Sequence, residues 1–193
     1  MIFGHYLAIA QQLEGLMAPE GAEHPTLGPY ALRDVQIWTD QTASDDWNHA
    51  LPVAFVEFLD LPMQSLGDGT SVGPAQLIIH LLLDLAEAEG IMSPEFTSEP
   101  DHPVHAADRL CHAVHAAMQR FSAVIPRTPG QLDTATPYAD SQLSALSLVS
   151  VQPTTPYPGM LDLRLRYAAT VGFSSALKPS AAGRGQTVRL TAT

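Results

Sequence analysis

The sequence predicts an α+β fold, in which a mixed, mostly antiparallel sheet of about five strands is flanked by two main helices. Two apolar runs, 51–61 and 75–84, are joined by the glycine-rich segment LGDGTSVGP and predict paired strands. A later segment, 103–121, has its apolar residues at helical spacing. A final run, 161–171, alternates leucines with charged residues, as a half-exposed antiparallel strand does.

The N-terminal segment predicts one amphipathic helix over residues 2–18. Its apolar side chains recur every three or four residues, and Pro19 follows directly. A Gly- and Pro-rich loop and a short strand at 35–38 come next. The polar stretch TDQTASDDWNHA then forms a loop that leads to the first apolar run.

The two apolar runs are expected to lie in the middle of the sheet. Residues 53–59 are apolar on both faces apart from Glu57, which is typical of a central strand. The next strand opens at Pro74, because proline is tolerated at the start of a strand, and it contains His80. The segment between the two runs lacks the lysine and the following helix of a phosphate-binding loop, so we interpret it as a turn. The glycines that would allow positive φ there are Gly67, Gly69 and Gly73.

The helix over 103–121 is preceded by an acidic segment, 86–101, with two prolines, which we interpret as a mobile loop. Asp101 is a suitable N-cap, and a proline at the first turn needs no hydrogen-bonded N–H. The apolar face of the helix includes Cys111, so a packed thiol is favoured over a nucleophile.

Strands are expected at 142–151 and 161–171, separated by the turn QPTTPYPGM. Beyond that point the sequence is small and polar, which is typical of a tail that orders only on a partner. The chain is therefore predicted to form a single α+β domain over 1–171, followed by a flexible C-terminal tail over 172–193.

The charge balance excludes several classes of partner. The formal net charge is −11, with nine basic residues against twenty acidic ones, which argues against a phosphate-binding surface. No apolar run is long enough to span a membrane, no secretory pattern is present, and a single cysteine suits a reducing compartment. We therefore expect a protein that is soluble and cytoplasmic at synthesis. Only 15% of the residues are charged, which favours a homo-oligomer that covers part of its surface.

One face of the helix over 103–121 is the sharpest candidate for chemistry. On a helix, its three histidines and one aspartate fall within about 80° of arc. A zinc or iron site would need this type of ligand set, and a small metal-dependent enzyme is one alternative function. A polar surface at a subunit contact explains the same residues and is favoured. The residues are His105, Asp108, His112 and His115.

Histidine 80 lies inside an apolar strand. Glu57 could be its partner if the two strands pair in the right register, and a buried or interface polar pair is favoured over a catalytic one. We assign no catalytic residue, no cofactor and no metal. The candidates for interface residues are Trp38, Trp47, Asp68, His105 and His112.

The order of motifs resembles the phage tail terminator or tail completion family and its minor-tail relatives. The chain shows a leading helix, then VQIWTDQ, PVAFVEFLDL, LGDGTSVG, LIIHLLLD and a helix that begins in HPVHAADRL. The resemblance covers about residues 2–152 and consists of strand patterns and their order. The acidic segment 86–101 and the tail after Gly172 depart from the pattern.

This resemblance implies a structural, non-enzymatic function. Such a protein assembles as a ring, commonly a hexamer, on the end of the tail tube. The ring stops tube growth and presents the surface to which the head connector docks, while DNA passes through without specific binding. After assembly the protein would be located in the virion tail. A second alternative is an adaptor of a contractile injection machine.

Overall fold

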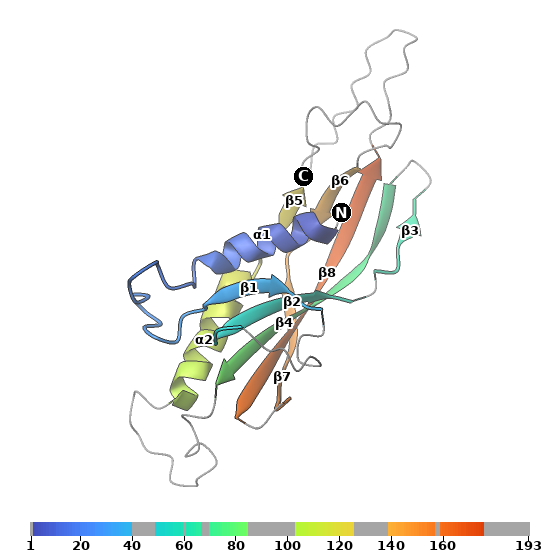
Figure 1. Ribbon diagram of the computed structural model, residues 1–193. Helices are drawn as coiled ribbons and strands as arrows, with labels where there is room; N and C mark the ends of the chain where they lie inside the picture. The colour runs from blue at the N-terminus through green and yellow to red at the C-terminus, as the bar shows by residue number, and fades with distance from the viewer. Residues whose placement is uncertain are drawn as a thin grey trace.

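Two long antiparallel strands, β4 (Thr70–Asp84) and β8 (Met160–Ser175), form the centre of the fold in the computed structural model (Figure 1). The structure describes residues 2–39, 49–59, 61–66, 70–84, 103–125, 139–156 and 159–175. The other elements are α1 (Ile2–Glu14), β1 (Asp34–Ile37), β2 (Val53–Phe58), β3 (Gln64–Ser65), α2 (Pro103–Met118), β5 (Ala123–Ile125), β6 (Ala139–Leu143) and β7 (Ser147–Thr154).

The strands form one sheet in the order β1-β2-β4-β8-β6-β5, with β3 paired to β4 and β7 paired to β8. The β1–β2 pair is parallel, and the other strand pairs among the described residues are antiparallel. The predicted fold class is therefore confirmed: two helices accompany a mixed, mostly antiparallel sheet. None of the helices in the described part of the chain is long and apolar enough to cross a membrane.

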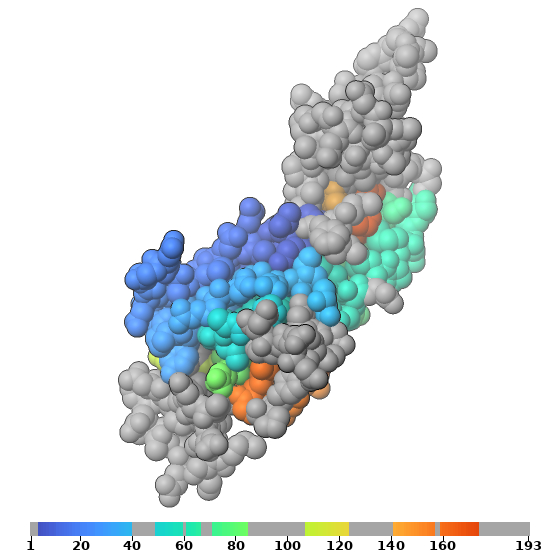
Figure 2. All heavy atoms as spheres, in the orientation of Figure 1, coloured from blue at the N-terminus to red at the C-terminus, as the bar shows by residue number. Residues whose placement is uncertain are grey.

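The two faces of the sheet differ in what covers them. Both helices pack on the first face, where the main apolar core lies (Figure 1). The described residues form an elongated body, with the blue N-terminal residues beside the light blue ones of β1 and the cyan ones of β2 (Figure 2). On the second face, Phe55, His80 and Arg164 are directly opposite one another on three neighbouring strands. Core residues of the first face include Ile9, Leu13, Val56, Ile79, Leu110, Val114, Met118, Leu165 and Tyr167.

The first helix is shorter than its apolar pattern predicts. It ends at Glu14, because the backbone of the following residues pairs elsewhere. The Leu32 N–H donates to the Leu16 carbonyl at 3.0 Å, and the Ala18 N–H donates to the Leu32 carbonyl at 3.3 Å. The second helix also ends early, at Met118, and Arg120 then adopts a φ of 62°.

The strand expected over 142–151 is two strands, β6 and β7. Both lie on the same side of β8, where β6 pairs with its C-terminal part and β7 with its N-terminal part. The break between them is fixed by Ser144, whose N–H donates to the Thr170 carbonyl and whose Oγ accepts from the Thr170 N–H, both at 2.8 Å. The Leu146 N–H also leaves the ladder and donates to the Phe121 carbonyl.

Two strand boundaries also differ from expectation. Strand β4 begins at Thr70, so Pro74 lies inside it and does not open it. The missing N–H costs no ladder bond there, because the neighbours of β4 on that side, β3 and β2, leave a gap beside Pro74. Strand β8 continues to Ser175, beyond the expected start of the tail. Residues 176–193, the acidic segment 86–101, Trp47, Asp68, Gly67 and Gly69 lie outside the described residues.

Gly73 is required by a close approach of two backbones. An added Cβ would lie 2.2 Å from the Pro62 carbonyl oxygen, whereas at Gly172 it would meet nothing within 4 Å. We expect Gly73→Ala to lower the free energy of unfolding by about 1–3 kcal/mol, because the overlap must be relieved by moving the chain. Gly172→Ala, in the neighbouring strand, should change it by less than about 0.5 kcal/mol. Urea denaturation of both variants measures the difference, and equal effects would contradict the expectation.

His5 joins α1 to β6 inside the protein. Its side chain is buried, its Nε2 lies 2.5 Å from the Ser141 Oγ, and burial lowers its pKa below the ordinary 6.5. Below pH 6.5 the unfolded chain therefore binds this proton while the folded protein does not, so stability falls with falling pH.

The slope from this one group cannot exceed about 1.4 kcal/mol per pH unit. We expect His5→Gln, which keeps a polar partner for Ser141, to lose less stability than the wild type between pH 7.5 and 5. Guanidinium denaturation across this range measures it, and parallel pH curves for the two proteins would show that His5 titrates normally.

Candidate functional site

A row of charged side chains crosses the second face of the sheet. His80 on β4 lies between two carboxylates: its Nε2 is 3.1 Å from Glu57 Oε2, and its Nδ1 is 3.1 Å from Asp162 Oδ2. The Arg164 Nε donates to the same Asp162 oxygen at 2.7 Å. We call these four residues the polar row. Their strands, β2, β4 and β8, are neighbours, so the register alone brings them together.

The surroundings of the polar row are apolar and hold the imidazole in place. The Trp38 indole stacks on the His80 ring with a centroid separation of 4.1 Å and an interplanar angle of 3°. Trp38 also meets the Phe55 ring edge-on at 5.7 Å. A small second core of Val53, Phe55 and Leu82 lies beside it. Stacking and packing therefore fix the ring plane, and the two carboxylates fix its rotation.

The electrostatics of the polar row centre on Asp162, which is completely buried. Burial by itself would raise the pKa of this carboxyl group, but hydrogen bonds from His80 and Arg164, together with their positive charges, hold it below the ordinary 3.8. The Thr154 Oγ1 adds a long contact of 3.4 Å to Oδ2, whereas Oδ1 has no partner among the described residues. Asp162 is therefore a permanent buried anion at neutral pH.

The arrangement favours an ion network over a catalytic relay. Ionised carboxylates only accept hydrogen bonds, so an imidazole between two of them donates from both nitrogens when it is protonated. In that form the polar row holds two negative and two positive charges and is neutral as a whole. Both polar partners of His80 in the described structure are carboxylates, so neither ring nitrogen is directed at a hydroxyl or a thiol.

Part of this site was predicted from the sequence. The conditional pairing of His80 with Glu57 is confirmed, since the β2–β4 register places both on the second face. Asp162 was expected on the exposed side of its strand, and this was wrong. The signal that could have found it is β4 itself: Ile78 and Leu82 flank His80 on the second face, so a strand beside them must be covered there too.

The described side chains on the histidine-rich face of α2 do not converge on one point. His112 Nε2 lies 3.5 Å from Asp108 Oδ1, and both side chains are exposed. His115 is half-buried, with its Nδ1 3.5 Å from the Tyr167 hydroxyl. His105 is in the helix, but its side chain lies outside the described residues. Among described side chains, no group of three or more histidines, cysteines and acids is placed to hold a metal ion.

Cys111, on the apolar face of α2, is partly buried against the core, and Tyr167 of β8 is fully buried in it. Burial, with a smaller contribution from the charge of Asp108, raises the pKa of the Cys111 thiol. Burial likewise raises the pKa of Tyr167 far above its ordinary 10. Both groups are therefore neutral at physiological pH, and Cys111 is a packed thiol and not an activated nucleophile.

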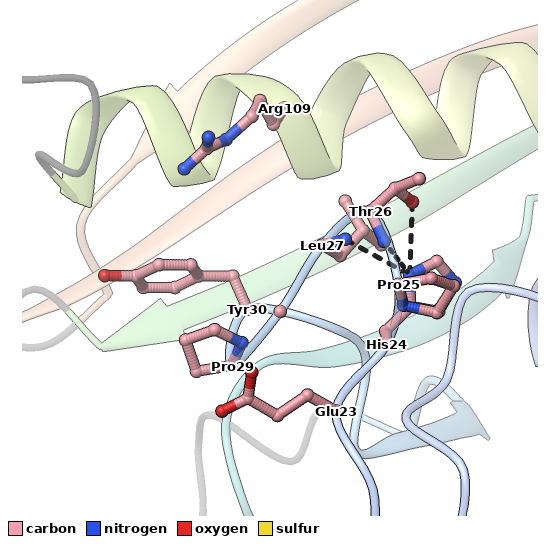
Figure 3. A pocket seen from close by; sticks show the side chains of 9 residues that line it. Glu23, His24, Pro25, Thr26, Leu27, Pro29, Tyr30 and Arg109 are labelled. Atoms are coloured by element: carbon pink, nitrogen blue, oxygen red, sulfur yellow. Dashed lines mark hydrogen bonds between the residues drawn. The ribbon is translucent and has the colours of Figure 1, made fainter.

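A pocket of about 560 Å³ lies on the helix side, between the loop of residues 23–30 and α2 (Figure 3). Arg109 projects from α2 beside it, and Tyr30 lies on the loop opposite (Figure 3). His24 shapes the loop: its Nδ1 accepts from the Thr26 and Leu27 N–H groups, and its Nε2 donates to the Gly15 carbonyl. Because both nitrogens of His24 are used by the backbone, it serves the loop and not a ligand. The pocket contains no residue of the polar row.

A third feature is the edge strand β7, which exposes apolar side chains. Leu148, Val149 and Val151 are 36%, 60% and 45% exposed. The strand pairs with β8 alone among the described residues, and Val149 is the extra residue of a bulge. An uncharged edge with exposed apolar side chains is a typical site of strand pairing with another chain.

The chain matches no protein-family model, and no curated protein is significantly similar to it in sequence.

Proposed function

We propose that this chain is a phage or prophage tail assembly protein, a tail terminator that forms a ring on the end of the tail tube. The observation that carries the proposal is the exposed apolar edge of β7, because an uncovered strand of this kind suits a protein whose surface is completed by other components of an assembly. The motif order in the sequence supports the same assignment.

Two further observations support a structural function. The charges of the polar row are paired with one another, which is typical of a group that stiffens a sheet. The net charge of −11 favours a protein that lets DNA pass without holding it. In this proposal the ring, a hexamer by analogy, contacts the tube protein on one side and the head connector on the other, in the virion tail.

The proposal is tested by the state of the purified protein. Light scattering and negative-stain microscopy at high concentration should show a closed ring, and pull-down with the tail-tube protein encoded in the same genome should show binding. A gel-shift assay with double-stranded DNA should show none at physiological salt. A strict monomer without affinity for the tube protein would contradict the proposed function.

A further inference from the structure

The outer edge of β7 has backbone groups that the sheet does not use. Pro153 lies in this strand, and prolines in edge strands direct their nitrogen away from the ladder. Val151, two residues earlier, directs its N–H and C=O to the same side, away from β8. Toward the N-terminal end of β7, the bulge at Val149 interrupts the regular backbone. Toward the C-terminal end, Pro153 has no N–H to donate. The edge therefore suits one short added strand.

The side chains beside this edge differ between the two faces. On the second face, Ser150 is directly opposite Arg166 of β8, and Gln152 is opposite Arg164. Arg166 is exposed and has no ion-pair partner in the described part of the chain, and its cross-strand neighbour Ser150 is small and exposed. On the first face, the exposed apolar groups of Leu148 and Val151 border the same edge. An added strand would therefore meet the Arg166 guanidinium group on one face and apolar groups on the other.

We propose that β7 takes up an extended strand of another protein, whose side chains alternate between carboxylates and apolar groups. The carboxylates would face Arg166, and the apolar side chains would pack beside Leu148 and Val151, with backbone hydrogen bonds to Val151. This inference rests on the proposed function, because it treats β7 as an assembly surface and specifies the chemistry of its partner.

A second copy of this chain fits the edge less well. Pairing β7 with β7 of another copy would bring two Arg166 side chains to the same face without a carboxylate between them. At the opposite edge of the sheet, the Val35 N–H donates to Asp34 Oδ1 and the Val35 carbonyl accepts from the Tyr6 hydroxyl, so side chains already occupy the backbone of β1. Strands β3 and β5 have only two and three residues. None of the described strands of a second copy fits this edge well, and we therefore assign the partner strand to a different protein.

The test uses blocked synthetic peptides and the full chain labelled for NMR. A short peptide of alternating valine and glutamate should shift the amide signals of Ser150, Val151 and Gln152. Arg166→Gln should weaken its binding about three- to fivefold, as expected for loss of one exposed ion pair. The matched control is Arg109→Gln, which removes an exposed arginine on α2, away from β7. It should leave the binding unchanged.

Three results would overturn the inference. These are equal binding of an alternating valine–lysine peptide, equal binding of a peptide with the same valines and glutamates in separate blocks, or loss of self-association in Val151→Lys. The last would make β7 a contact between copies. Failure here can be told from failure of the proposed function: rings that form but bind no peptide contradict only the partner chemistry. If the protein is a monomer that binds the peptide at β7 but does not bind the tube protein, only the tail function is contradicted.

Discussion

Replacing Asp162 by asparagine is expected to lower the free energy of unfolding by about 3 kcal/mol, since removing one member of a buried ion network leaves its partners uncompensated. The substitution keeps the size of the side chain, so no cavity adds to the effect. His80 would then keep only Glu57, which is 27% exposed at its side chain, and Arg164 would lose its carboxylate partner. Equilibrium unfolding in urea at neutral pH measures the loss.

The matched control is Asp108→Asn on α2. Asp108 also contacts a histidine, His112 at 3.5 Å, but both side chains are exposed, so we expect a change below about 0.5 kcal/mol. A double-mutant cycle of Asp162→Asn with Arg164→Gln should show a coupling energy of about 1–3 kcal/mol. A loss at Asp162 no larger than that at Asp108 would contradict the view that the polar row stabilises the sheet.

The stability difference between the wild type and Asp162→Asn should depend on pH. The folded-state pKa of Asp162 lies below its ordinary 3.8, so the stability it contributes is fully present above that value. This stability is lost as the pH falls through 3.8 toward the folded-state pKa, because the unfolded chain then binds the proton while the folded protein does not. The loss is complete once the folded protein is protonated too. The difference between wild type and Asp162→Asn should therefore be constant near neutrality and shrink in acid.

Replacing Leu110 by alanine is expected to cost about 3 kcal/mol of unfolding free energy, from lost burial and the cavity left behind. Leu110 is fully buried where α2 packs on the first face of the sheet. Leu7→Ala on α1, where the side chain is 59% exposed, removes the same atoms and should cost less than about 0.5 kcal/mol. Thermal and urea unfolding of the pair measure the contrast, and equal losses would mean that α2 is not anchored through this face.

The elements with strong periodicity were predictable from local sequence. The helical spacing of apolar residues after Pro103 found α2, and the two runs around His80 and Glu57 found β2 and most of β4. Their ends were less predictable, because they depend on distant partners. Helix α1 ends where the backbone after Glu14 pairs with Leu32, and no local signal marks that bridge.

Of the candidate site, the pair of His80 and Glu57 was predictable from the sequence, and Asp162 was not. A histidine in an apolar strand needs a polar partner, and Glu57 is the polar residue of the preceding apolar run. Asp162 comes from a strand far away in the sequence, and its alternation with leucines is the pattern of an exposed face. Its burial follows from the β4–β8 register, which places Asp162 on the same face as His80, and Trp38 stacks on the His80 ring. Register between distant strands is a tertiary property that periodicity does not contain.

The position of β8 has a consequence for the way the chain is made. This last described strand pairs with β4, β6 and β7, and its partner β4 lies far upstream in the sequence. During synthesis the apolar run of β4 therefore lacks its main neighbour until β8 has left the ribosome. Such non-local pairing predicts slow folding and a nascent chain that needs protection from aggregation. We expect truncation before Met160 to give an insoluble product, and co-expression with a chaperone to raise the yield of the complete chain.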